Sequence, residues 1–235
     1  MKKTNKPKTS YLSDYKSNTK TAKNLRISTI LYLAPLMQNS YGVNLCPRAS
    51  EGCSKACLFT AGRGAFKNVA QARIRRTDAM LSDRIKFVQD IVAEINHGAS
   101  FVDGEFAVRL NGTSDIKLVE WCVSSGIKIA DNVVFYDYTK HPNKAGSHIL
   151  PTGHRYVVAF SRSEVNESQV LEHLQGGGIA AVVFDKLPET WHGFKVYDGD
   201  ERDDLMLDIV GGGVLGLKAK GKANKDDSGF VVKVK

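Results

Sequence analysis

The sequence predicts an α/β fold, either a compact or partial TIM-like (β/α) barrel or, as the alternative, an open parallel α/β sheet. Short, nearly continuous apolar runs indicate strands that are covered on both faces. Helical segments lie between several of these runs, which favours a largely parallel sheet. The 235 residues suffice for one large α/β domain. Because a full (β/α)₈ barrel usually takes about 250 residues, we expect a reduced version.

The predicted elements follow one another along the chain. The first apolar run, 27–34, precedes a long helical region in which 67–80 and 83–97 carry apolar residues at three- and four-residue spacing. Further strands are predicted at 106–110, 133–136, 156–160, 179–184, 194–197, 214–217 and 230–234, and further helices at 115–124 and 164–174. The stretch 185–193 is short for a helical crossover. We therefore expect that this connection is irregular or that one of the predicted strands is antiparallel.

The charge of the chain is concentrated at its start. Within residues 1–26, seven lysines and Arg26 face one acidic residue, Asp14, although the whole chain has a formal net charge of +8. This composition cannot bury enough apolar surface to order itself, so we expect a basic, flexible N-terminal arm at 1–26 and a single α/β domain at 27–235. Such an arm can bind nucleic acid, or it can be a solubilising terminus.

No stretch approaches the roughly 18 apolar residues of a membrane span, and the lysine-rich start does not have the apolar segment of a secretory signal. We expect no membrane partner and a cytoplasmic location. In that reducing compartment, clustered cysteines bind metal or carry out redox chemistry rather than form disulfides.

Three of the four cysteines, Cys46, Cys53 and Cys57, form a C-x6-C-x3-C pattern in a stretch rich in Pro, Gly and Ser. Three thiolates this close suit an iron–sulfur cluster with one iron left open, so we predict a [4Fe–4S] cluster. Zinc prefers four closed ligands and would need a histidine or Cys122 as well. Cys122 is far away in sequence, and we expect it to be a buried structural thiol.

Polar residues follow successive strands, and in a parallel fold such strand ends open onto one face where a ligand binds. We expect a small-molecule ligand beside the cluster. Its predicted binding residues are Asn111, Ser114, Tyr136, Arg162 and Lys218, and its predicted catalytic residues are Asp115, Asp137 and Lys140. Three arginines at the start of the helical region, Arg73, Arg75 and Arg76, fit a solvated helix face better than a phosphate site.

The position of the cysteine stretch after the first strand resembles that of radical SAM enzymes. In those enzymes a three-cysteine loop holds a [4Fe–4S] cluster whose open iron binds S-adenosylmethionine, which the resemblance implies as a possible cofactor. The spacing departs from their usual C-x3-C-x2-C pattern, and Ala56 stands where an aromatic residue precedes the last cysteine. Their Gly-Gly-Glu segment after the second strand is also absent.

The chain also resembles a phage family of proteins called gene product 88, over nearly all of its length after residue 18. The resemblance implies a phage origin, and therefore the cytoplasm of an infected bacterial host, without implying an activity. The segments that carry it are 18–21, 46–57, 60–64, 109–116, 135–140, 160–164, 198–200 and 216–221.

Two functions of different classes follow. The first is an iron–sulfur enzyme with radical-SAM-like architecture, whose open cluster iron binds a small molecule. The alternative is a non-catalytic, metal-stapled protein that contacts nucleic acid or a host protein. The convergent charged groups at the strand ends favour the enzyme, and the segregated basic arm favours the binding protein.

Overall fold

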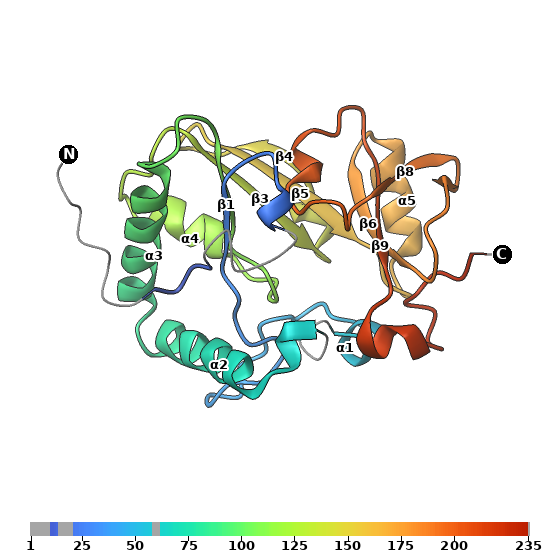
Figure 1. Cartoon of the computed structure of the whole chain (residues 1–235), viewed down its shortest axis with the longest axis horizontal. Helices are drawn as coiled ribbons and strands as arrows, with labels where there is room; N and C mark the ends of the chain where they lie inside the picture. The colour runs from blue at the N-terminus through green and yellow to red at the C-terminus, as the bar shows by residue number, and fades with distance from the viewer. Residues whose placement is uncertain (1–9, 14–20, 58–61, 235) are drawn as a thin grey trace.

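The computed structural model describes residues 10–13, 21–57 and 62–234, and a mixed sheet of nine strands lies at its centre (Figure 1). The spatial order is β1-β2-β3-β5-β6-β9-β8-β7, with β4 added on β5. The strands are β1 (Ser28–Ile30), β2 (Phe106–Arg109), β3 (Val133–Thr139), β4 (Gly146–Ile149), β5 (Arg155–Ser161), β6 (Ile179–Phe184), β7 (Thr190–Trp191), β8 (Phe194–Asp198) and β9 (Gly213–Lys218).

The sheet is mostly parallel. Every pair of neighbouring strands in the series β1-β2-β3-β5-β6-β9-β8 runs parallel. Two pairs are antiparallel: β4 with β5, and β7 with β8. The α/β class is therefore confirmed. The stretch 185–193 is an irregular connection rather than a helical crossover, and it contains the two-residue strand β7, which pairs antiparallel with β8. Closure of the sheet into a barrel stays a prediction.

Helices cover the sheet and its carboxyl edge. They are α1 (Glu51–Lys55), α2 (Lys67–Ser82), α3 (Arg84–Ala99), α4 (Leu118–Ser124) and α5 (Glu167–Gln175). In Figure 1, α3 and α4 lie beside the β1–β3 half and α5 beside β6, while α2 and α1 lie along the bottom of the view, below the sheet. The side chain of Asp83 begins α3 by accepting a hydrogen bond from the Lys86 amide at 2.9 Å.

Apolar side chains fill both faces of the sheet. On one face, Ile91 and Ile95 of α3 are fully buried against strand residues such as Val108. On the other face, Met206 and Leu207 of the short helix η5 (Leu205–Leu207) pack on alternate residues of β2, β3 and β5. Coverage on both faces explains why the strand sequences are almost continuously apolar.

Cys122 of α4 belongs to this core and is fully buried, as expected. Burial raises the pKa of its thiol to about 12. This thiol is therefore held as a neutral apolar group.

Much of the predicted arm, 1–9 and 14–20, lies outside the described residues. The described part packs on the domain: Leu12 bridges Leu31, and the amides of Tyr11 and Leu12 donate to the buried Glu94 carboxylate at 2.7 and 3.0 Å. Arg26 pairs with Asp208 at 2.8 Å. Residues 10–13 and 21–26 thus contribute to the folded body.

Three elements differ from the prediction. The cysteine stretch contains helix α1, and β4 lies in a segment for which no strand was predicted. The predicted last strand, 230–234, is reduced to a single bridge between Phe184 and Val232. Among the helices of the described ranges, none combines the length and apolar character that a membrane crossing requires.

Candidate functional site

A cavity of about 370 Å³ lies at the carboxyl ends of the parallel strands. It is lined from the cysteine stretch and from the residues that follow β2, β3, β5 and β9. Of the residues predicted to form the site, those that line this cavity are Cys46, Cys53, Cys57, Asn111, Ser114, Asp115, Lys140, Arg162 and Lys218. The structure therefore brings strand ends that are distant in sequence to the three thiols.

Cys53 lies in helix α1, and contacts to a distant loop hold this helix in place. Ser50 caps the helix by accepting a hydrogen bond from the Cys53 amide at 3.2 Å. Glu164, from the loop after β5, accepts from the Ser50 hydroxyl and from the Gly52 amide, both at 2.8 Å. The position of this cysteine thus depends on a loop more than a hundred residues further along the chain.

Cys46 lies against the loop that follows β2. Its Sγ is 3.7 Å from the carbonyl oxygen of Thr113, and its amide donates to the Asn44 side chain at 2.8 Å. Burial, together with the nearby Cys57 and Cys53 thiols, raises the pKa of Cys46 to about 11. A metal that binds here must displace the proton of this thiol, so its affinity rises with pH.

Throughout the described ranges, no three His, Cys, Asp or Glu side chains are grouped as the ligands of one metal ion would be. In an iron–sulfur cluster each thiolate binds a different iron atom, so its cysteines stand further apart than the ligands of a single ion. The three thiols line one cavity, and the iron–sulfur cluster stays a prediction.

Asn111 organises the loop between β2 and α4. Its side-chain oxygen accepts from Ser114 Oγ at 2.9 Å and from the Ile116 amide at 3.1 Å. Its side-chain nitrogen donates to Asp137 at 3.0 Å and to the Ile116 carbonyl at 3.1 Å. These bonds use both donors and both acceptor positions of the amide. The loop is held in place by this residue.

Two predicted site residues, Tyr136 and Asp137, do not line the cavity. Both are completely buried in β3. The Tyr136 hydroxyl donates to Asp203 at 2.9 Å, and Asp137 accepts from the Asn111 amide at 2.9 Å. Burial raises the pKa of Asp137 to about 6, although Lys144, Arg109 and the bonds from Asn111 oppose the shift.

Asp115 connects three segments at the cavity. Its carboxylate accepts from the Thr139 hydroxyl and from the Lys140 amide, both at 2.8 Å, and its own amide donates to the Leu45 carbonyl at 2.8 Å. It therefore ties the loop after β2 to the end of β3 and to the residue that precedes Cys46.

The cations of the cavity differ in how they are paired. Arg162 donates to Glu167 at 2.6 Å and to the Phe230 carbonyl at 2.9 Å, and Lys218 lies 3.5 Å from Asp198. The Lys140 ammonium lies over the Phe230 ring at 5.8 Å, and no described carboxylate is within ion-pair distance of it. Lys140 is therefore suited to bind an anion.

The sequence interpretation missed several lining residues. Arg73, expected on a solvated face, is only 7% exposed and lines the cavity from α2. Arg109, Asp203 and Phe230 line it as well. Arg109 lies in the strand-end segment and could have been found there, whereas Arg73 and Phe230 reach the cavity through tertiary packing that no local pattern indicates.

The fold and the cavity define an α/β protein with a mostly parallel sheet and a thiol-lined polar site at its strand ends. The sequence profile of the family described as Gene product 88 matches residues 2–234, so the chain belongs to this phage family. No curated protein and no solved structure matches the chain. These comparisons do not support the resemblance to radical SAM enzymes.

Proposed function

We propose that Cys46, Cys53 and Cys57 hold a [4Fe–4S] cluster and that the protein is an enzyme acting on a small anionic molecule bound beside it. The observation that carries the proposal is the shared cavity: all three thiols line it together with the strand-end cations. When bound by three cysteines, such a cluster offers an open iron for ligand binding and electron transfer.

The protein's own groups have separable parts in this proposal. Lys140, which has no ion pair among the described carboxylates, binds a carboxylate or phosphate of the ligand, and Lys218 adds positive charge. Asp115 positions Lys140 through the hydrogen bond to its amide. Asp137 positions the loop after β2 through Asn111. Arg162 fastens the C-terminal segment over the cavity.

Cysteine variants test the cluster assignment. We expect the wild-type protein, purified and reconstituted without oxygen, to contain iron and sulfide. Cys46→Ala, Cys53→Ala and Cys57→Ala should each lose most of both, because the cluster needs all three thiolates. Cys122→Ala is the matched control and should keep the wild-type content. Equal iron in Cys53→Ala and wild type, or loss of iron in Cys122→Ala, contradicts the assignment.

The ligand part of the proposal has its own test. The electron paramagnetic resonance spectrum of the reduced cluster should change when a ligand reaches the open iron. Small carboxylates and phosphates are added first, and S-adenosylmethionine, which has a carboxylate but is a net cation, is added separately. Lys140→Met should weaken this response about tenfold while it leaves the iron content unchanged. A spectrum that no small anion changes would leave the cluster assignment standing but would end the proposal of an open iron.

A further inference from the structure

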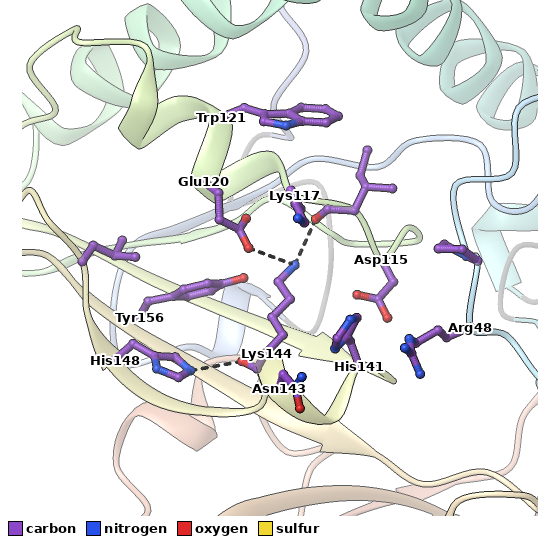
Figure 2. Close-up of a pocket in the computed structure, with 13 residues that line it drawn as sticks. Arg48, Asp115, Lys117, Glu120, Trp121, His141, Asn143, Lys144, His148 and Tyr156 are labelled. Carbon is purple, nitrogen blue, oxygen red and sulfur yellow. Dashed lines mark hydrogen bonds and ion pairs between the residues drawn. The ribbon is translucent and has the colours of Figure 1, made fainter.

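A second cavity, of about 610 Å³, lies between α4, the loop after β3 and β5 (Figure 2). It borders the cysteine site: Asp115 lines both cavities, and Pro47 and Arg48, which follow Cys46, line this one. Its volume is within the range of about 300 to 1,000 Å³ that small-molecule sites have. Much of its lining is apolar or aromatic, from Ile116, Trp121, Leu150 and Tyr156.

Two polar atoms of this cavity are buried without a hydrogen-bond partner among the described residues. They are Oε2 of Glu120 and Nδ1 of His141. The Glu120 side chain as a whole is 40% exposed, so its carboxylate faces the cavity in part and can accept further hydrogen bonds. A ligand that brings an N–H group to Glu120 would use this acceptor.

Lys144 lies next to this carboxylate. Its ammonium donates to the Ile116 carbonyl at 2.9 Å and is 3.9 Å from Glu120 Oε1. An ammonium has three donors, so Lys144 can present another to a ligand oxygen beside Glu120. In Figure 2 the Glu120 carboxylate and the Lys144 ammonium point toward one another, the Tyr156 ring lies next to Glu120 in this view, and the Trp121 ring lies at the top of the view.

We propose that this cavity binds a planar heteroaromatic ring with a lactam edge, with guanine as the best-fitting base. A lactam has an N–H next to a C=O, which matches an acceptor (Glu120) next to a donor (Lys144). Guanine also carries an exocyclic amine that gives the carboxylate a second donor, and its O6 accepts from lysine. The ring faces pack against the aromatic and aliphatic side chains.

Calorimetric titration of the full chain with three nucleosides tests the choice of ligand. Guanosine should bind most tightly, and inosine several-fold more weakly because it has no exocyclic amine. Adenosine should bind at least tenfold more weakly than guanosine, since its ring edge has an amine where guanine has the carbonyl. Adenosine binding as tight as guanosine binding, or no guanosine binding, overturns the proposal.

Three variants test the residues. Glu120→Gln and Lys144→Met should each weaken guanosine binding about tenfold, with unchanged circular dichroism, because each removes one partner of the lactam edge. Glu189→Gln, on an exposed residue that does not line the cavity, should bind as wild type does. Wild-type affinity in Glu120→Gln refutes the assignment.

The same titration on Cys53→Ala separates this inference from the proposed cluster. Because the second cavity does not include a cysteine, the variant should keep its affinity for guanosine. Loss of binding in this variant would show that the nucleoside site depends on the cysteine site and would overturn the proposal of an independent site.

Discussion

Asp137 should make the stability of the protein depend on pH in an unusual direction. Burial raises the pKa of its carboxyl from 3.8 to about 6. A carboxyl with a raised pKa stabilises the fold fully below its unfolded pKa, and this contribution is lost as the pH rises through about 6. Since one pKa unit corresponds to about 1.4 kcal/mol, the loss between pH 4 and pH 7 is about 2 to 3 kcal/mol.

Asp137→Asn removes the titration while it keeps the size of the side chain. The variant should be less stable overall, because an amide nitrogen then faces donors from Asn111. The decisive quantity is the difference between wild type and variant in free energy of unfolding. Between pH 4 and pH 7 that difference should shrink by about 2 to 3 kcal/mol.

Urea denaturation at pH 4, 5, 6 and 7 measures this difference. Asp131→Asn is a suitable control because the Asp131 side chain is 86% exposed, and its curve should run parallel to that of the wild type. Parallel curves for wild type and Asp137→Asn would refute the reasoning, as would a wild-type protein that gains stability relative to the variant at higher pH.

Two further predictions concern packing around the site. Gly52→Ala should lower the free energy of unfolding by about 1 to 3 kcal/mol, because the added Cβ would lie 2.7 Å from Cβ of Phe230. Gly104→Ala is the control and should be nearly neutral, since open space surrounds that position. Equal denaturation curves for the two variants would contradict this prediction. Glu94→Ala should lower the free energy of unfolding by about 1 to 3 kcal/mol, because the Tyr11 amide then has no carboxylate to donate to. The N-terminal segment should be released, and the Tyr11 amide should exchange its hydrogen faster. An unchanged exchange rate would contradict this prediction.

The strand pattern could be predicted because the buried parallel strands have apolar sequences that need no further context. Strand β4 escaped prediction because its residues are mostly exposed and it pairs only with β5. Strand β7 has only two residues, Thr190 and Trp191. Neither has the continuous apolar run that indicated the other strands.

The site was predictable to the extent that it depends on parallel topology. Strand-end residues such as Lys140 and Arg162 reach one cavity because parallel strands end on the same side. Helix α1 was not predictable, because a stretch of Gly, Ser and Cys is a weak helix former and Glu164 holds it from a distance. The burial of Asp137 likewise depends on neighbours in space, so the sequence alone could not show that this residue is buried and does not line the cavity.

The most direct test of the central claim is the Mössbauer spectrum of the protein reconstituted with ⁵⁷Fe in the absence of oxygen. With three cysteine ligands, the spectrum should contain one iron site distinct from the others, and this site should change when a small anionic ligand binds. Cys57→Ala should give little or no such signal. Equivalent iron sites that no ligand alters, or a reconstituted protein without iron, would contradict the account.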